Sequence, residues 1–479
     1  MSRNILLVEP GYKTKFPPMG LMKISTYHKM LGDNVLFNKG TNITYDIASI
    51  FWDRIYISTM FTYNWKITVD TIMEYKKKLV DGDSSRIFIG GILASLMFNE
   101  LWNETGIVPI RGLLDQPGAL GDKNQHIIDQ LIPDYSLFNN INHEYSLIKD
   151  SYFGYSTKGC IHKCKFCGVP KLEPKYVDYL DIKSYVNAIK TAYGEKHHLV
   201  LMDNNVLASS SFNKIINDIK DLGFEKGSKL NNKLRYVDFN QGNDARLIVK
   251  DKSKMKLLSE IAIHPLRIAF DHISLKTQYT ESIHLAAKYG IKYLSNYILY
   301  NYNDTPEDLW ERLKLNIDLN SDLKLSIYSF PMKYIPLDHK NRSYINEPNW
   351  NWYYIRGVQR ILNVLKGSVM TNSEFFTRAF GESKEEFIKI LHMPEKLLMN
   401  RTRNPQKDEK IWSNKFDKLS DNEKRELLGI LNENRTIALL SKITKQTKNR
   451  KLKSILEFYE IDTTETDIEY DNILPMSYK

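Results

Sequence analysis

Cysteine is nearly absent from this chain. Only three of its 479 residues are cysteine, and all three lie between positions 160 and 167. A fold held together by disulfides is therefore excluded, because such a framework needs pairs of cysteines spread along the chain. Unpaired cysteines are typical of a reducing compartment, so we expect a cytoplasmic protein.

Long apolar runs are also missing. No stretch approaches the roughly 18 consecutive apolar residues that a membrane-spanning helix needs, although hydrophobic residues make up 42% of the chain. The first apolar run ends after Val8 with Glu9 and Pro10, and no small-residue cleavage site follows it. We therefore expect a buried first strand here, no secretory signal and no membrane association.

Acidic residues are outnumbered by basic ones in residues 401–455. The chain carries a net charge of +10, and residues 401–455 contain 15 Lys or Arg against 7 Asp or Glu. Such a surplus attracts nucleic acid or acidic partners. Acidic residues are nevertheless interspersed among the basic ones, which is typical of a solvated helical surface. Both interpretations stay open at the level of the sequence.

The length of the chain favours two or three domains. Within residues 1–111, short apolar runs alternate with amphipathic stretches. The runs cover 5–8, 35–37, 55–58 and 87–89, and the stretches between them include 21–31 and 68–79. This pattern predicts an α/β fold that begins with a Rossmann-like parallel sheet covered by helices. Residues 112–149 are rich in turn formers and predict a linker.

A second alternating series follows the linker. Its apolar runs cover 199–202, 236–240, 267–270, 293–299 and 325–329. Repeated βα units gather their functional groups at the carboxyl ends of the strands, so we predict a full or partial TIM-like barrel over residues 150–345.

The pattern loses its strands after this region, and residues 346–479 predict a mostly helical C-terminal region. We expect helices over 350–367, 383–399 and 420–442, the last two introduced by Ser383 and Ser420 as N-caps. An acidic, frayed tail is expected from Thr463.

The three cysteines form a compact motif. Cys160, Cys164 and Cys167 have the spacing Cys-x-x-x-Cys-x-x-Cys, with Phe166 just before the last one. Iron-sulfur clusters favour thiolate ligands, and a cubane held by three thiolates leaves one iron open for a cofactor or substrate. Nearby lysines at 158, 163 and 165 would lower the thiolate pKa values and offset the negative charge of the cluster.

Two alternatives to an iron-sulfur cluster remain. A structural zinc site usually needs four Cys or His ligands at other spacings, and His162 lies awkwardly inside the loop for that purpose. Three unpaired buried cysteines would be an unusual accident of spacing.

The motif and the βα series after it resemble the radical S-adenosylmethionine (SAM) superfamily over roughly residues 150–335. The resemblance implies that Cys160, Cys164 and Cys167 hold three irons of a 4Fe-4S cluster while SAM chelates the fourth. It also implies reductive cleavage of SAM to a 5'-deoxyadenosyl radical that abstracts hydrogen, with an external electron donor such as flavodoxin or ferredoxin. Phe166 resembles the family's aromatic position beside adenine.

Other cofactor-binding positions follow from the same resemblance. The segment 202–205 (Met-Asp-Asn-Asn), with Asp203 and Asn204, occupies the place of the family's Gly-Gly-Glu stretch after the second strand, which receives the SAM amino group. Polar groups after the third strand would face the SAM ribose or the substrate, and Tyr300 would lie near adenine. These polar groups are Asn240, Gln241 and Asp244. Turns and helix caps are the competing explanation for them, because Asn and Asp favour local hydrogen bonds.

The first region resembles the cobalamin-binding domain of the cobalamin-dependent radical SAM class. The resemblance is carried by the segments 16–21 (Phe-Pro-Pro-Met-Gly-Leu), 58–60 (Ser-Thr-Met) and 90–91 (Gly-Gly). No histidine follows the first strand, where cobalamin proteins with a lower axial histidine have an Asp-x-His-x-x-Gly motif. Either cobalamin binds without a protein histidine or the domain has taken on another role. Aromatic residues that would wall a corrin ring are Tyr12, Phe61, Tyr63 and Trp65.

The cysteine count narrows the chemistry further. Beyond the three cysteines of the motif, none is left to bind an auxiliary cluster or to act as additional catalytic cysteines. The radical SAM subclasses that need additional cysteines are therefore excluded. The resemblance predicts a radical SAM enzyme, with cobalamin-dependent methylation of an unactivated carbon as the leading reaction. The alternatives are a nucleic-acid or nucleotide modifying radical SAM enzyme without cobalamin and a non-catalytic iron-sulfur sensor. The sequence singles out no general acid or base.

Overall fold

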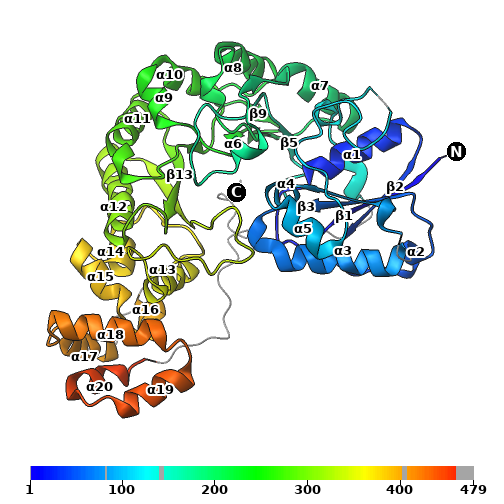
Figure 1. Ribbon diagram of the computed structural model, residues 1–479. Coiled ribbons are helices and arrows are strands. Elements are labelled where there is room, and N and C mark those ends of the chain that lie inside the picture. The colour runs from blue at the N-terminus through cyan, green and yellow to red at the C-terminus, as the bar shows by residue number, and fades with distance from the viewer. Residues whose placement is uncertain (1, 81–82, 124, 140–144, 402–406, 460–479) are drawn as a thin grey trace. The chain divides into compact units, whose positions relative to one another are not determined.

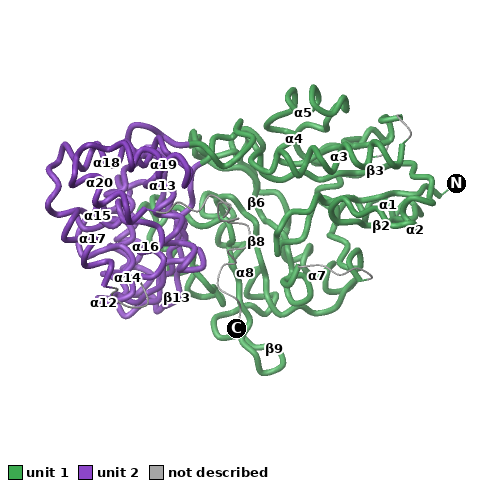
Figure 2. Tube along the Cα trace, turned by 90° about the horizontal axis from the view of Figure 1, so that it is seen from below, with its two compact units in different colours: residues 1–267, 335–344, 476–479 green, residues 268–334, 345–475 purple. Residues whose placement is uncertain are grey.

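The computed structural model describes residues 2–80, 83–123, 125–139, 145–401 and 407–459 (Figure 1). The predicted acidic tail from Thr463 lies outside these residues. The described chain separates into two compact units (Figure 2). The first contains the residues up to 267 together with 335–344, and the second contains 268–334 and the residues that follow 344. The sequence predicts four parts with other boundaries than these two units, and that division stays a prediction.

The first unit opens with a parallel sheet of four strands in the order β2-β1-β3-β4. The strands are β1 (Asn4–Glu9), β2 (Asn34–Lys39), β3 (Arg54–Thr59) and β4 (Ile87–Gly91), which confirms the four predicted runs. The helices are α1 (Met19–Met30), α2 (Tyr45–Ala48), α3 (Trp65–Leu79), α4 (Ile92–Leu96) and α5 (Phe98–Thr105). Helix α1 covers one face of the sheet, and α3 and α5 cover the other (Figure 1). Burial of both faces explains the continuous apolar runs.

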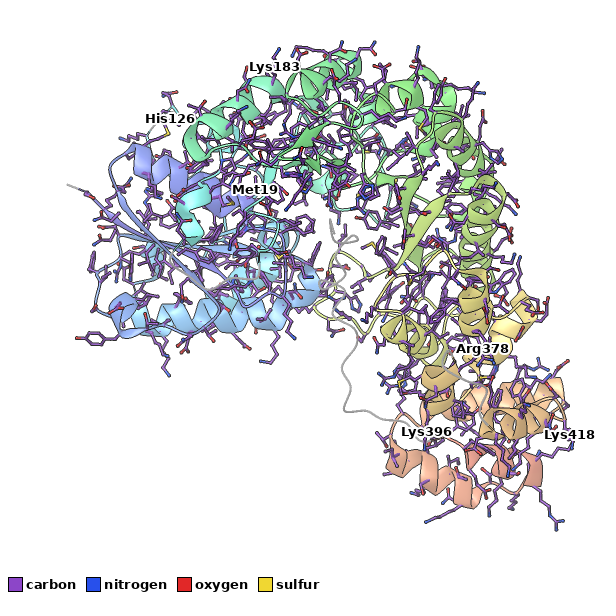
Figure 3. All side chains as sticks on the ribbon, turned by 180° about the vertical axis from the view of Figure 1, so that it is seen from behind. Met19, His126, Lys183, Arg378, Lys396 and Lys418 are labelled. Atoms are coloured by element: carbon purple, nitrogen blue, oxygen red, sulfur yellow. The ribbon has the colours of Figure 1, made fainter. Side chains whose placement is uncertain are left out.

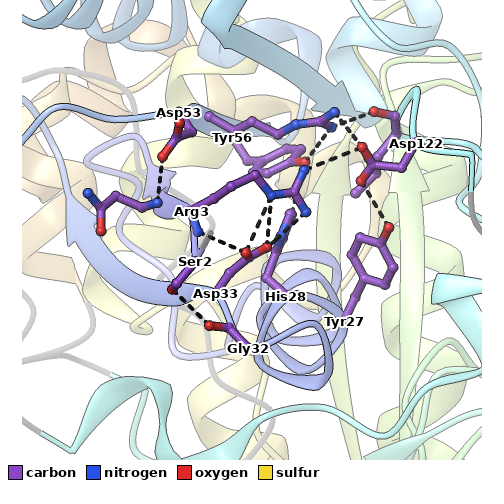
Figure 4. A network of polar contacts seen from close by, with 12 residues as sticks. Ser2, Arg3, Tyr27, His28, Gly32, Asp33, Asp53, Tyr56 and Asp122 are labelled. Atoms are coloured by element: carbon purple, nitrogen blue, oxygen red, sulfur yellow. Dashed lines mark hydrogen bonds and ion pairs between the residues drawn. The ribbon is translucent and has the colours of Figure 1, made fainter.

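A polar network fixes the loop around residue 122 to the amino end of this sheet (Figure 4). The Arg3 guanidinium donates to Asp33 at 2.8 Å, and His28 joins Asp33 (Nδ1 to Oδ2, 2.7 Å) to the hydroxyl of Tyr56 (3.0 Å). The Tyr27 hydroxyl donates to Asp122 at 2.9 Å. A part of the predicted linker is thereby held against the first sheet.

Gly91 permits a close approach between β3 and β4 at their carboxyl ends. Its φ is +113°, and a Cβ there would lie 2.3 Å from the carbonyl oxygen of Thr59. Gly91→Ala is expected to destabilise the first unit by about 2 kcal/mol, because both the backbone conformation and the contact become strained. Urea unfolding measures the change. The matched control is Gly20→Ala in α1, where a Cβ would meet nothing within 4 Å. Equal stability of the two variants would contradict the prediction.

A second parallel sheet of the first unit has the order β11-β8-β5. Its strands are β5 (Ser151–Gly154), β8 (His198–Leu201) and β11 (Val237–Phe239). Two-residue strands β6 (Thr157–Lys158) and β7 (Val177–Asp178) form an antiparallel pair beside the cysteine loop. The remaining elements are α6 (Val169–Leu172), α7 (Ile182–Tyr193), α8 (Phe212–Asp221), α9 (Ala245–Lys250), α10 (Ser253–Leu258), the hairpin of β9 (Lys229–Leu230) and β10 (Lys233–Leu234), and β12 (Leu266–Arg267). The predicted strands over 199–202 and 236–240 are confirmed.

The second unit contains the parallel pair β13 (Tyr293–Tyr300) and β14 (Ser326–Lys333), as the runs 293–299 and 325–329 predict. Helix α11 (Lys276–Lys288) precedes β13, and α12 (Pro306–Leu323) joins the two strands. A capping box formed by Thr305 and Asp308 fixes the start of α12. Arg312 in α12 is fully buried and pairs with Asp304 at 2.6 Å. The described chain therefore has an α/β fold with parallel sheets and many helices.

The C-terminal part of the second unit is helical, as predicted. Its helices are α13 (Trp352–Val364), α14 (Ser373–Phe380), α15 (Lys384–Leu391), α16 (Glu395–Arg401), α17 (Lys407–Phe416), α18 (Asp421–Glu433), α19 (Ile437–Gln446) and α20 (Arg450–Leu456). Ser383 and Ser420 are N-caps as predicted.

Two of the predicted C-terminal helices are wrong in length. The helix expected over 383–399 is divided into α15 and α16, because Pro394 lacks the N–H that an uninterrupted helix requires. The helix expected over 420–442 is divided into α18 and α19 by Asn434, and Thr436 caps the new helix by accepting from the Leu439 N–H. No helix in the described chain is long and apolar enough to cross a membrane.

His392 is buried in the helical core of the second unit, where burial lowers the pKa of its imidazole to about 4. The unfolded state takes up a proton near the ordinary value of about 6.5, so stability falls as the pH drops from about 6.5 to 4, by up to about 3 kcal/mol. His392→Gln should make this fall shallower in urea unfolding at pH 7, 6 and 5. The exposed His284, replaced in the same way, is the control and should keep the wild-type slope. A His392 variant with the wild-type slope would be the contrary result.

Candidate iron-sulfur site

The cysteine loop follows β5 and β6 at the carboxyl edge of the second sheet. It runs from the end of β6 to the start of α6. Gly159 opens the loop with a φ of +76°, and a Cβ at this position would lie 2.2 Å from the carbonyl oxygen of Lys175. Only glycine fits this approach, so the residue before Cys160 is fixed by the local backbone. All three cysteines are half-buried, and none forms a disulfide bond within the described residues.

Hydrogen-bond donors are directed at the sulfurs. The His162 N–H lies 3.4 Å from the Cys160 sulfur, and the Val169 N–H lies 3.4 Å from the Cys167 sulfur. The Asn205 side-chain amide adds a donor 3.5 Å from the Cys160 sulfur. Donors of this kind stabilise thiolate charge, which is the form that iron binds. The donor set therefore fits an iron-sulfur cluster.

Among the described residues, no group of three or more Cys, His, Asp or Glu side chains is placed to hold a single metal ion. A closed zinc site requires its ligands to converge on one ion. In a cubane each thiolate binds a different iron, so the three sulfurs need not converge.

Glu173 and Asn204 anchor the start of the loop. The Glu173 carboxylate accepts from the Gly159 N–H at 2.6 Å and from the Asn204 side-chain amide at 2.7 Å. The structure therefore brings Asn204, one of the predicted cofactor-binding residues, to the cysteine loop.

His162 and Asp244 hold the middle of the loop. The His162 ring bonds to the Asp244 carboxylate, which also accepts from the Arg246 side chain at 2.9 Å. Burial alone would raise the pKa of Asp244, but the hydrogen bonds and charge of Arg246 and the charge of His162 hold this pKa below its usual range. Asp244 is also the N-cap of α9. Asp244, one of the predicted cofactor-binding residues, therefore both caps α9 and bonds to the cysteine loop.

Asp203 is directed at the strand that precedes the loop. It is 1% exposed. Its carboxylate accepts from the Ser156 hydroxyl at 2.7 Å, from the Thr157 N–H at 2.6 Å and from the Thr157 hydroxyl at 2.7 Å. The Ser156 N–H adds a fourth bond at 3.0 Å. Asp203 therefore positions the chain before the cysteines, and its predicted contact with SAM stays a prediction.

The remaining predicted residues take no part in the hydrogen bonds described above. Asn240 follows β11 at the same sheet edge and accepts from Gln241 at 3.4 Å. Phe166 is half-buried within the cysteine loop. Tyr300 belongs to the second unit, where it is fully buried with its ring 5.5 Å from that of Trp350. Their cofactor roles stay predictions.

Asn205 belongs to the segment 202–205 that the resemblance placed at the cofactor, but it was not among the predicted cofactor-binding residues. It is 3% exposed and directly follows the predicted pair Asp203 and Asn204. Its place in the same loop after a strand was the available signal.

Lys158 was expected to offset the negative charge of a cluster. Its ammonium instead pairs with the carboxylate of Asp129, which already compensates the charge of Lys158.

Cations cover two of the aromatic residues predicted to wall a corrin ring. Within the first unit, the Arg342 guanidinium lies 3.9 Å from the ring centre of Tyr63, and the Lys340 ammonium lies 3.9 Å from that of Trp65. Tyr12 is buried, and its hydroxyl bonds to that of Thr68 at 2.6 Å. Phe61 stacks on Tyr63 with a centroid distance of 5.2 Å and stays partly exposed.

No protein-family model and no curated protein matches this chain. Its fold is similar to that of the radical SAM methyltransferase TsrM from Kitasatospora setae. TsrM with cobalamin and a 4Fe-4S cluster bound gives a TM-score of 0.50 at 15% identity, over 71% of this chain and 77% of TsrM. TsrM with tryptophan substrate and the SAM analogue aza-SAM gives 0.50 at 16% identity, over 70% and 75%.

A third solved structure is that of OxsB, a cobalamin-dependent SAM radical enzyme, with aqua-cobalamin and SAM bound. It gives a TM-score of 0.48 at 15% identity, over 65% of this chain and 51% of OxsB. At such low identity the likeness to TsrM establishes the fold, and function has to be argued from the site. The predicted resemblance to the cobalamin-dependent radical SAM class is confirmed at the level of the fold.

Proposed function

We propose that this chain, which has the fold of the methyltransferase TsrM, is a radical SAM enzyme with one 4Fe-4S cluster on Cys160, Cys164 and Cys167. The cysteine loop carries the proposal. Three half-buried cysteines lie on one loop at the carboxyl edge of a parallel sheet, with N–H donors directed at Cys160 and Cys167. Three thiolates leave one iron open for SAM.

The cluster and SAM, when bound, supply reductive homolysis of the sulfonium and with it hydrogen abstraction. The chain's own residues hold the loop. Asp203 fixes the strand that precedes the loop. Glu173 bonds to the first residue of the loop, and His162 holds the middle of the loop. We also propose that an external one-electron donor such as flavodoxin or ferredoxin reduces the cluster, and that the βα units after residue 150 form a full or partial barrel.

Cobalamin-dependent methylation of an unactivated carbon is the reaction we propose. The order β2-β1-β3-β4 places its switch point between β1 and β3, where open α/β sheets bind ligands, as in Rossmann-like domains. The segment with Gly91 at the end of β4 and the TsrM fold both support cobalamin at this edge. No histidine follows β1 in the segment 10–15, so we propose binding without a lower axial histidine from that loop.

The first experiment is electron paramagnetic resonance of anaerobically reconstituted, dithionite-reduced protein with and without SAM. We expect a reduced 4Fe-4S signal that changes when SAM is added, together with 5'-deoxyadenosine in the products. An absorbance scan after incubation with hydroxocobalamin tests the cobalamin proposal separately. A cluster that ignores SAM would indicate an iron-sulfur sensor, and the absence of any cluster would refute the proposal.

A second candidate, modification of a nucleic acid, is favoured by the outer surface of α19 and α20. Residues 435–459 contain seven Lys or Arg and one acidic residue. Five of these cations are exposed with no carboxylate of the described chain within ion-pair distance. They are Lys442, Lys445, Lys448, Arg450 and Lys453. Charged side chains such as Lys418 also lie on the outside of this helical region (Figure 3).

The salt dependence of RNA binding tests this second candidate function. Binding of a duplex or single-stranded RNA through several phosphate contacts should weaken steeply between 50 and 200 mM salt. Lys442→Glu combined with Lys445→Glu should weaken it further. The control is Lys183→Glu, a substitution at a half-exposed position in α7 of the first unit. No binding at 50 mM salt would leave the surface as a solvated helical face.

A further inference from the structure

We infer that Asn205 sets the reduction potential of the cluster by donating a hydrogen bond to the Cys160 thiolate. The inference rests on the proposed function, because it needs the cluster to be present. The inference is based on the position of the Asn205 side chain, which is buried and only 3% exposed. Its Nδ2 atom lies 3.5 Å from the sulfur of Cys160.

The side chain of Asn205 does not cap the helix that follows it. Asparagine at such positions usually forms a helix cap or a turn. Asn205 precedes the short 3-10 helix Val206–Ala208 in the N-cap position, yet its side chain makes no cap hydrogen bond. Its Oδ1 is buried and has no hydrogen-bond partner in the described chain. The bond to Cys160 is therefore the contact that accounts for this amide.

The backbone of Asn205 is held independently of its side chain. The carbonyl oxygen accepts from the Tyr176 hydroxyl at 3.1 Å and from the Ala208 N–H at 3.1 Å. The side-chain amide then faces the sulfur with its donor end, since the oxygen end would repel a thiolate. A substitution of the side chain can remove this donor while the backbone bonds remain.

A donor at a cluster sulfur changes the potential in a defined direction. Reduction adds one negative charge to the cluster, and hydrogen bonds to its sulfurs stabilise that charge and raise the potential. The donors from His162 and Val169 are backbone N–H groups that a side-chain substitution leaves in place. Asn205 is thus a side-chain donor at Cys160 through which the sequence can tune the cluster.

The test is a potentiometric titration of the reconstituted full chain without SAM, followed by the paramagnetic signal of the reduced cluster. Asn205→Leu, which keeps the branching at Cγ and the number of side-chain heavy atoms but has no donor, should shift the midpoint to a more negative potential. Asn205→Asp, similar in shape but with a charge beside the thiolate, should shift it further. Asn217→Leu and Asn217→Asp are the matched controls on the exposed face of α8 and should keep the wild-type midpoint.

The outcomes separate this inference from the proposed function. Variants that load iron and sulfide like the wild type and titrate at the wild-type midpoint would overturn the inference alone. If neither Asn205 variant loads a cluster while circular dichroism shows an intact fold, Asn205 only shapes the loop, and the inference is likewise overturned. A wild-type protein that takes up no cluster would refute the proposed function itself.

Discussion

Cys164→Ala is expected to abolish cluster binding and SAM cleavage. The chain has only three cysteines, so no other thiolate is available to take the place of Cys164. Substitutions around a metal site typically cost up to about 100-fold in affinity, and loss of a ligand should cost more than that. Anaerobic reconstitution followed by iron and sulfide analysis, electron paramagnetic resonance and chromatography of 5'-deoxyadenosine measures the effect.

The fold of the Cys164 variant should be intact, since the side chain is half-buried in a loop. Far-UV circular dichroism checks this. Lys163→Ala is the matched control in the same loop, where the ammonium donates to the carbonyl oxygen of Pro174 at 2.9 Å and binds no iron. A Cys164 variant that still forms a SAM-responsive cluster would exclude Cys164 as an iron ligand.

Asp203→Ala is expected to destabilise the first unit by about 4 kcal/mol. Its carboxylate is fully buried and accepts four hydrogen bonds, two from backbone N–H groups and two from hydroxyls, all of Ser156 and Thr157. Each buried donor left without a partner costs about 1–3 kcal/mol, and the costs are only partly additive. Urea unfolding gives the change in stability, and hydrogen exchange at the Ser156 and Thr157 amides reports it locally.

Two controls separate this role from a general loss of charge. Asp203→Asn keeps an oxygen acceptor for the same donors and should cost only about 1 kcal/mol. Asp221→Ala removes a carboxylate from the exposed end of α8, where Asp221 pairs with Lys183 at 2.7 Å, and should change stability by less than about 1 kcal/mol. If Asp203→Ala unfolds at the wild-type urea concentration, the four bonds do not position the strand.

Asp203 also shows where prediction from the sequence ends at the site. The resemblance to the radical SAM superfamily predicted its place directly after a strand, and Asp203 does follow β8 closely. The direction of its carboxylate was not predictable. Ser156 and Thr157 lie 47 and 46 residues away in the chain, and only the parallel pairing of β5 with β8 brings them to Asp203.

The sequence by itself determined the local features of this protein. The spacing of Cys160, Cys164 and Cys167 predicted a cluster-binding loop, and the apolar runs identified the strands of the first sheet, because both signals reside in a few neighbouring residues. The N-caps Ser383 and Ser420 were likewise legible, since a cap bonds to a backbone N–H three residues on.

Only the tertiary structure decided which distant residues serve the loop. The Glu173 carboxylate accepts from Gly159 and from Asn204, His162 bonds to Asp244, and the Asn205 amide donates to Cys160. These contacts join residues 14 to 82 positions apart. The physical reason is that strand order and sheet edge set such distances, and neither is encoded in the periodicity of a single segment.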